Sequence, residues 1–198
     1  MEIIVPAVIA HGGAGPGPKR QKNLEIAVQK AASILSSGGT ALEAAVEACV
    51  ILEDDSVFNA GTGSVIRTDG SVLTDASIQV GDGRVGFVIA MEDTPNPIRV
   101  AADLLDEEIN GLTSAGARLW ADQRSHLNAK VEGRSPEGQI GDENAAVTGD
   151  TVGVIARDNT GMIVVATSTG GCSYRPPGRV GDVPLPGSGF WAEDCLAV

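Results

Sequence analysis

The sequence predicts a mixed α+β fold in which an antiparallel sheet, built from hairpins, packs against helices. Several segments carry apolar residues at helical spacing, and several pairs of short apolar runs are joined by tight-turn residues. The two kinds of segment alternate along the chain. We expect one domain over residues 1–198, because 198 residues of which 42% are hydrophobic can bury one sizeable core.

The first part of the chain is expected to hold a strand and two helices. Residues 5–10 form a short apolar run that ends in a glycine-rich segment. A helix is expected next, because apolar residues between Leu24 and Leu35 fall on one helical face. Thr40 and Glu43 have the spacing of a capping box, which predicts the start of a second helix.

Hairpin and helix patterns follow in the middle of the chain. Asp69-Gly70 is a tight-turn pair between two short apolar runs, and Pro97 marks a helix start. The expected elements are a hairpin over 65–73, a second hairpin turning at 81–83, and helices over about 98–109 and 113–126.

The last third begins with a polar stretch. Residues 129–148 are rich in Gly, Pro, Glu and Asp and lack periodicity, which indicates a linker that extends to about residue 150. Beyond it, residues 152–156 and 162–166 form a hairpin pattern, and residues 195–198 form a further apolar run.

Charge and cysteine usage exclude several classes. The net charge of −12 argues against binding nucleic acid or an anionic membrane. No apolar run approaches the ~20 residues of a membrane span, and the first residues lack the basic region of a signal peptide. Cys49, Cys172 and Cys195 are too widely spaced for a zinc site or a disulfide framework. We therefore expect the protein to reside in the reducing environment of the cytoplasm.

One threonine has an unusual setting. Gly149-Asp150-Thr151-Val152-Gly153 follows the polar linker and opens a strand, which predicts a peptide bond that is cut between Asp150 and Thr151. An N-terminal threonine combines a nucleophilic hydroxyl with its own α-amine as base. That amine titrates near pH ~8, so part of it is unprotonated at neutral pH.

A set of motifs in register resembles one family. The segments are His11-Gly12-Gly13-Ala14-Gly15, Phe58-Asn59-Ala60-Gly61-Thr62-Gly63-Ser64, Gly149-Asp150-Thr151-Val152-Gly153, Ala166-Thr167-Ser168-Thr169-Gly170-Gly171 and Gly178-Arg179-Val180-Gly181-Asp182. Together they resemble the plant-type L-asparaginase/isoaspartyl peptidase family of N-terminal nucleophile hydrolases. The resemblance implies a four-layer αββα sandwich. It also implies cleavage into an α subunit (1–150) and a β subunit that starts at residue 151, and a dimer of αβ units.

The resemblance also implies roles for individual residues. Thr151 matches the nucleophile, Thr169 a second threonine that orients it, and Asn59 a residue used in processing and catalysis. Arg179 matches the residue that binds the substrate α-carboxylate, and Asp182 the partner of its α-ammonium. No cofactor is required, but a structural sodium ion is implied, held by backbone carbonyls of the loop that contains Leu52, Glu53, Asp55, Phe58, Ala60 and Thr62.

The resemblance implies hydrolysis of L-asparagine, of β-aspartyl dipeptides, or of both, and glycosylasparagine stays open as an alternative. Family members continue past residue 198 with a further Thr-Gly segment. We therefore expect this chain to be incomplete at its C-terminus, less active than a longer version and prone to aggregate.

Simpler interpretations compete at several residues. Thr151 is a good strand former in any context, and Asn59 could occupy a turn. Arg179 and Asp182, three apart, could pair with each other on the surface. His11 more often fills a turn than acts as a base, and His126 is expected to interact with the end of a helix.

Features typical of other classes of protein are weaker in this sequence. Cys49 is expected to pack in the core, and Cys172 has no histidine close in sequence that would make it a nucleophile. The segment from His11 to Gly17 is reminiscent of a phosphate-binding loop, but it lacks the G-x-G-x-x-G spacing and Pro16 removes a donor. A non-catalytic binding module is the remaining alternative.

Overall fold

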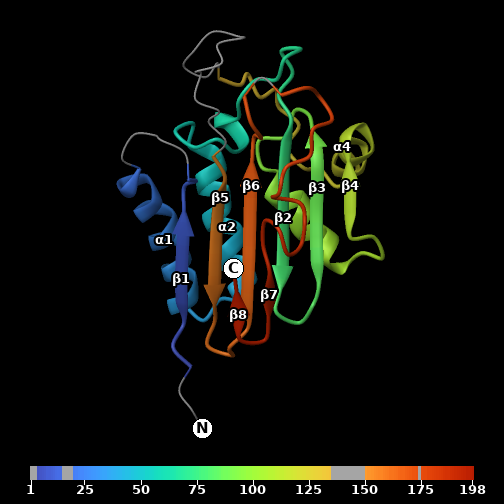
Figure 1. Cartoon of the computed structure of the whole chain (residues 1–198). Coiled ribbons are helices and arrows are strands. Elements are labelled where there is room, and N and C mark those ends of the chain that lie inside the picture. The colour runs from blue at the N-terminus through green and yellow to red at the C-terminus, as the bar shows by residue number, and fades with distance from the viewer. Residues whose placement is uncertain (1–3, 15–19, 135–149, 174) are drawn as a thin grey trace.

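The centre of the molecule is a six-stranded sheet, in a computed structural model that describes residues 4–14, 20–134, 150–173 and 175–198 (Figure 1). The strands are β1 (Ala7–His11), β2 (Thr74–Val80), β3 (Val85–Met91), β4 (Gly111–Thr113), β5 (Val152–Arg157) and β6 (Ile163–Thr169). Their order is β1-β5-β6-β2-β3-β4, and every neighbouring pair is antiparallel except β3 with β4. The mixed α+β fold with a hairpin-built sheet is therefore confirmed.

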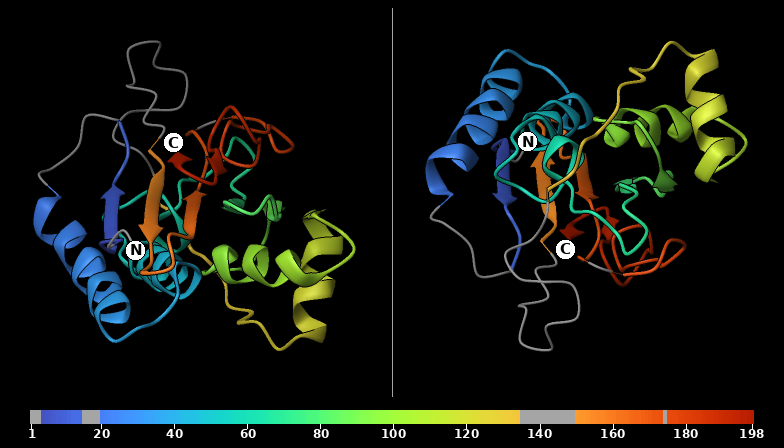
Figure 2. Two further views of the ribbon diagram at one scale, coloured as in Figure 1. Left: turned by 90° about the horizontal axis from the view of Figure 1, so that it is seen from below. Right: turned by 90° about the horizontal axis from the view of Figure 1, so that it is seen from above.

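The helices cover one face of this sheet, and the C-terminal segment lies over the other (Figure 2). The helices are α1 (Gln21–Ser36), α2 (Ala41–Asp54), α3 (Pro97–Asp103) and α4 (Ser114–Gln123), with single 3-10 turns η1 (Gly61–Gly63) and η2 (Leu104–Asp106). The C-terminal segment contains the hairpin of β7 (Ala192–Glu193) and β8 (Leu196–Ala197). No helix in the described ranges has the length and hydrophobicity needed to cross a bilayer.

Helix α2 is the central helix of the core. It packs against α1 on one side and against β5 and β6 on the other. Its buried side chains include four alanines, and small side chains allow a helix to lie close to a sheet. The predicted capping box is confirmed: Thr40 Oγ1 accepts from the Glu43 amide at 3.2 Å, and a Glu43 carboxylate oxygen accepts from the Thr40 amide at 2.9 Å.

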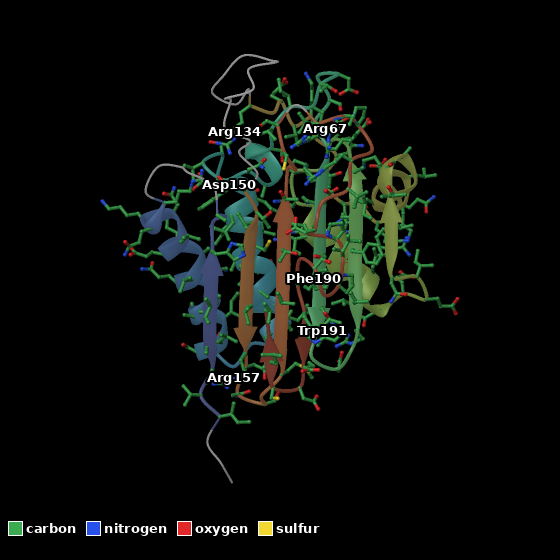
Figure 3. The ribbon with its side chains drawn as sticks, viewed as in Figure 1. Arg67, Arg134, Asp150, Arg157, Phe190 and Trp191 are labelled. Atoms are coloured by element: carbon green, nitrogen blue, oxygen red, sulfur yellow. The ribbon has the colours of Figure 1, made fainter. Side chains whose placement is uncertain are left out.

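Strand β6 is buried along its whole length because both faces of the sheet are covered there. On the face opposite α2, Val165 packs against Phe190 and Ala192 of the C-terminal segment. Figure 3 shows Phe190 and Trp191 in front of the sheet. By contrast, β1 lies at the sheet edge, and its residues alternate between exposed and partly buried.

Three expectations about secondary structure need correction. The hairpin over 65–73 is only a turn, in which the Arg67 amide donates to the Ser71 carbonyl, because Val65 pairs with Arg134 instead. The helix expected over 98–109 ends at Asp103 and continues as η2, and the helix expected over 113–126 is Ser114–Gln123. Residues 135–149, most of the expected linker, lie outside the described residues.

The antiparallel order of the strands brings distant residues to one edge of the sheet. In the strand registers, His11 lies opposite Gly153, Val152 opposite Ser168, and Asp75 opposite Thr169. The end of β1, the start of β5 and the end of β6 therefore meet at one end of the molecule, the upper end in Figure 1.

Candidate active site

A pocket of about 470 Å³ opens at this end of the sheet. Its lining residues are His11, Gly13, Ala14, Thr151, Thr169, Gly171, Cys172, Arg179, Asp182 and Gly189. Four of the residues that the sequence predicted for the site, Thr151, Thr169, Arg179 and Asp182, are thus brought together. They come from the start of β5, the end of β6 and the loop that follows β6.

Asn59 lies behind the pocket wall and is fully buried. Its side-chain amide nitrogen donates to the Asp150 carbonyl at 3.1 Å and to the Gly171 carbonyl at 2.5 Å, and its amide oxygen accepts from the Val65 amide at 3.1 Å. Its backbone carbonyl also accepts from the Gly170 amide at 2.8 Å. Asn59 thereby joins the loop after α2 to the residue before Thr151 and to the turn after β6, which is more than a turn residue needs.

The carbonyl oxygen of Asp150 accepts a second side-chain hydrogen bond. The Thr169 hydroxyl donates to it at 2.9 Å and itself accepts from the Gly171 amide at 3.1 Å. The close packing needs glycine at 170, because a Cβ there would lie 2.4 Å from the Ser64 Cβ and 2.5 Å from the Asn59 amide oxygen. The carbonyl that precedes Thr151 therefore accepts from two buried side chains.

The side chain of Asp150 is held as firmly as its carbonyl. Arg20 Nη1 lies 2.6 Å from the carboxylate and also donates to the Gly12 carbonyl at 2.9 Å. Gly13 has φ +97°, and a Cβ there would lie 2.8 Å from the Asp150 side chain. Glycine at position 13 therefore leaves room for the Asp150 side chain, which explains why this segment is rich in glycine. Sequence reasoning missed Arg20, since no local pattern links residues 130 positions apart.

Arg179 and Asp182 both remain available to a ligand. Asp182 is exposed and Arg179 partly buried, and among the described ion pairs none joins the two side chains. The geometry thus disfavours the interpretation that they simply pair with each other. A guanidinium and a carboxylate that line the same pocket suit the carboxylate and ammonium of an amino acid.

A second arginine, Arg67, lies directly behind the pocket wall. It is 1% exposed, none of its guanidinium nitrogens has a hydrogen-bond partner among the described residues, and Nη2 lies 3.1 Å from the position of a Cβ on Gly171. Burial lowers its pKa, the charge of Asp75 opposes this, and the charge of Arg179 adds to it. Sequence reasoning missed Arg67, although a charged residue directly after the apolar pair Val65-Ile66 was a sign of an unusual environment.

The histidines differ in their settings. His11 lines the pocket, and its Nδ1 accepts from the Gly13 amide at 3.3 Å. Although the residue is exposed overall, its ring packs against Gly153, and this burial lowers its pKa. His126 lies just beyond α4, and its ring pairs with Asp103 at 2.9 Å and stacks on Trp120, so its side chain contacts other side chains rather than the helix end.

The three cysteines are free thiols. Cys49 is fully buried in the core cluster, as expected, and burial raises its pKa. Cys195 is exposed. Cys172 lines the pocket beside Thr169, and sequence reasoning missed this position.

The segment expected to hold sodium, residues 52–62, is not all loop: Leu52 and Glu53 belong to the last turn of α2, and Thr62 belongs to η1. Backbone carbonyl oxygens lie close to the glycines of this segment. A Cβ on Gly61 would lie 2.6 Å from the Glu53 carbonyl oxygen, and a Cβ on Gly63 would lie 2.0 Å from the Phe58 carbonyl oxygen. Within the described residues, no group of three or more His, Cys, Asp or Glu side chains is arranged to hold a metal.

Comparison with known proteins identifies the relatives of this chain. The family described as Asparaginase matches residues 4–133 and 108–198. The plant-type L-asparaginase of Pyrobaculum calidifontis is 36% identical over 94% of this chain and 70% of its own length. The isoaspartyl peptidase/L-asparaginase of Macaca fascicularis is 38% identical over 96% of this chain and 68% of its own length.

The chain belongs to the asparaginase family. It is accordingly a hydrolase, and the resemblance seen in its five glycine-rich motifs is confirmed. The human isoaspartyl peptidase/L-asparaginase is similar at 36% identity over 96% of this chain and 68% of its own length.

Proposed function

We propose that this chain is an amidohydrolase precursor that cuts itself between Asp150 and Thr151 and then uses Thr151 as the nucleophile. One observation carries the proposal: the carbonyl of Asp150 accepts hydrogen bonds from Asn59 at 3.1 Å and from Thr169 at 2.9 Å. Two fixed donors on the carbonyl next to a pocket threonine are the arrangement that stabilises an oxyanion.

Self-cleavage then proceeds in two steps. The Thr151 hydroxyl oxygen attacks the Asp150 carbonyl carbon, and the negative charge that develops on the carbonyl oxygen is stabilised by Asn59 and Thr169. The C–N bond breaks, the hydroxyl proton ends on the threonine nitrogen, and an ester joins Asp150 to the Thr151 oxygen. Water hydrolyses the ester, which yields a carboxylate on Asp150 and a free α-amine on Thr151.

The new α-amine supplies the base that the uncut chain lacks. It takes the proton from the Thr151 hydroxyl as the oxygen attacks a substrate amide, and an acyl-enzyme forms and is hydrolysed. Thr169 lies beside Thr151 in the pocket lining, in a position that supports its role in orienting the nucleophile.

The substrate proposed for this site is an amino acid with a side-chain amide. Arg179 binds the α-carboxylate through two parallel hydrogen bonds and Asp182 binds the α-ammonium, so that the side-chain carbonyl faces Thr151. Relatives named isoaspartyl peptidase/L-asparaginase support L-asparagine and β-aspartyl dipeptides as the substrate class. Glycosylasparagine remains the competing substrate.

Three further features belong to this proposal. The hairpin β7–β8, on the face opposite the helices, supports the second sheet of a four-layer sandwich. The backbone carbonyls of Glu53 and Phe58 would contribute to a sodium site, and a bound ion would fix the loop that carries Asn59. A dimer of αβ units is the assembly that we expect, and light scattering tests it.

The decisive experiment compares Thr151→Ala with Thr160→Ala, a control in the turn between β5 and β6 at the other end of the sheet. Intact-mass analysis should find two fragments with a new N-terminus at residue 151 in the wild type and in the control, but one uncut chain in Thr151→Ala. The hydrolysis of asparagine, β-aspartyl dipeptide and glycosylasparagine is measured in parallel at equal concentration. Fragments from Thr151→Ala with a terminus at 151 would show the nucleophile assignment to be wrong.

A further inference from the structure

The pair between Arg20 and Asp150 differs from the other ion pairs of the described residues. Its side chains are 10% and 2% exposed, whereas at least one member of every other described pair is more than a third exposed. Surface pairs contribute little, but a buried pair with good geometry fixes the position of both partners. Here one partner is the residue that precedes the proposed nucleophile.

Arg20 is itself held in place. It is the residue at the start of α1, and its carbonyl accepts from the Leu24 amide at 3.0 Å. Its guanidinium lies 5.7 Å from the centre of the Phe58 ring, and Nη1 binds the Gly12 carbonyl together with the Asp150 carboxylate. The arginine therefore connects a helix, the end of β1 and Asp150 through a single nitrogen.

Asp150 consequently has little freedom on any side. Arg20 holds its carboxylate, Gly13 lies close beside its side chain, and Asn59 and Thr169 hold its carbonyl oxygen. The peptide bond to Thr151 is thus held in place through both the side chain and the carbonyl of Asp150. Displacement of a reacting group by ~1 Å can cost ~10²-fold in rate, so such a fixed position matters for the attack.

A second cation stands near the same carboxylate. Arg134 and Asp150 lie at the same end of the sheet (Figure 3), and the charges of Arg20 and Asp150 both act on Arg134. Arg134 Nε is buried and has no hydrogen-bond partner in the part of the chain that the structure describes, and the backbone amide of Arg134 donates to the Ser64 carbonyl at 2.9 Å. Arg20 is therefore the cation that contacts the Asp150 carboxylate among the described ion pairs, and Arg134 lies at the same end of the sheet.

We infer that Arg20 is a positioning residue for self-cleavage, which holds Asp150 so that its carbonyl carbon stays in reach of the Thr151 hydroxyl. The inference rests on the proposed function, because it assumes that the bond between Asp150 and Thr151 is the one that is cut.

The test is a time course of cleavage, followed by intact mass, for Arg20→Met, Arg20→Lys and Arg157→Met. Arg157 is the control: it lies at the far end of β5 (Figure 3) and donates to the Val5 carbonyl at 2.9 Å on the surface. We expect Arg20→Met to slow cleavage by ~10–100-fold. Arg20→Lys should restore most of the rate, because one nitrogen makes both contacts, and Arg157→Met should match the wild type.

A second set of variants separates positioning from folding. Asp150→Asn should slow cleavage to a similar degree, and combining it with Arg20→Met should slow it no further, since both changes remove the same pair. Cleavage of a folded Arg20→Met variant at the wild-type rate would overturn the inference, as would independent, multiplicative effects in the double variant. If the wild type itself is not cut at residue 151, it is the proposed function that fails.

Discussion

Replacing Thr169 by valine is expected to slow self-cleavage by about 10²–10³-fold. Valine keeps the shape of threonine but removes the hydroxyl that donates to the Asp150 carbonyl at 2.9 Å. Thr169 is 4% exposed, and its hydroxyl lies between the Asp150 carbonyl and the Gly171 amide. One fixed donor to a developing oxyanion contributes about 3–4 kcal/mol, which corresponds to this factor, and Asn59 would remain as the other donor.

The same change also has a cost in stability. The Thr169 hydroxyl accepts from the Gly171 amide at 3.1 Å, and valine leaves this buried amide without that partner. We expect a loss of about 1–3 kcal/mol in the free energy of unfolding, which a urea titration measures. Thr169→Ser keeps the hydroxyl and should retain most of the cleavage rate.

The assay follows the uncut chain by intact mass, and circular dichroism confirms that each variant is folded. Ser168→Ala is the matched control: Ser168 is also fully buried, but as the adjacent strand residue it projects to the opposite face of β6. If folded Thr169→Val is cut as fast as Ser168→Ala, Thr169 does not polarise the carbonyl and the reasoning about the Asp150 oxyanion is wrong.

Three other changes test separate features. Arg179→Ala should raise KM for asparagine by an amount equivalent to ~2–5 kcal/mol, and Arg179→Lys should recover only part of it; unchanged steady-state kinetics would exclude the role. Gly13→Ala should slow cleavage in the mass time course, because its Cβ would collide with Asp150 and its φ of +97° is unfavourable for alanine. A normal cleavage rate would contradict the close contact between Gly13 and Asp150. Burial raises the pKa of Glu53 from 4.5 to about 8, so stability should fall as pH rises from 4.5 through 8, by at most ~5 kcal/mol. Glutamine cannot titrate, so the free energy of unfolding of Glu53→Gln, measured by urea titration, should differ much less between pH 5 and pH 8 than that of the wild type. An unaltered pH dependence in this variant would show that Glu53 is not its cause.

Much of the fold could be predicted because it depends on local sequence. The capping box of Thr40 and Glu43 forms between residues three apart, and the hairpin of β2 and β3 turns at residues 81–83 as expected. The hairpin over 65–73 was wrong although its turn residues are favourable. Val65 pairs with Arg134, far along the chain, instead of with a strand after Asp69-Gly70. No local pattern near Asp69-Gly70 predicts this long-range pairing.

The candidate site divides in the same way. Motifs alone named Thr151, Thr169, Asn59, Arg179 and Asp182, and the strand order brings four of them into one pocket and Asn59 behind it. Sequence reasoning assigned no role to Arg20, Arg67 or Arg134. Only Arg67 has a local sign of burial, the apolar pair Val65-Ile66 directly before it, and nothing in the sequence near Arg20 or Arg134 indicates which segments will cover them. Their environment comes from segments that meet only in the folded chain.

The sequence by itself determined the types of local element, the family and the residues that can act in catalysis or binding, since these depend on spacing along the chain. Only the tertiary structure decided which carbonyl faces Asn59 and Thr169, and which cation holds Asp150. Hydrogen bonds and buried ion pairs act over about 3 Å. The contact between residues 20 and 150 therefore exists only once the antiparallel sheet has brought the ends of β1, β5 and β6 together.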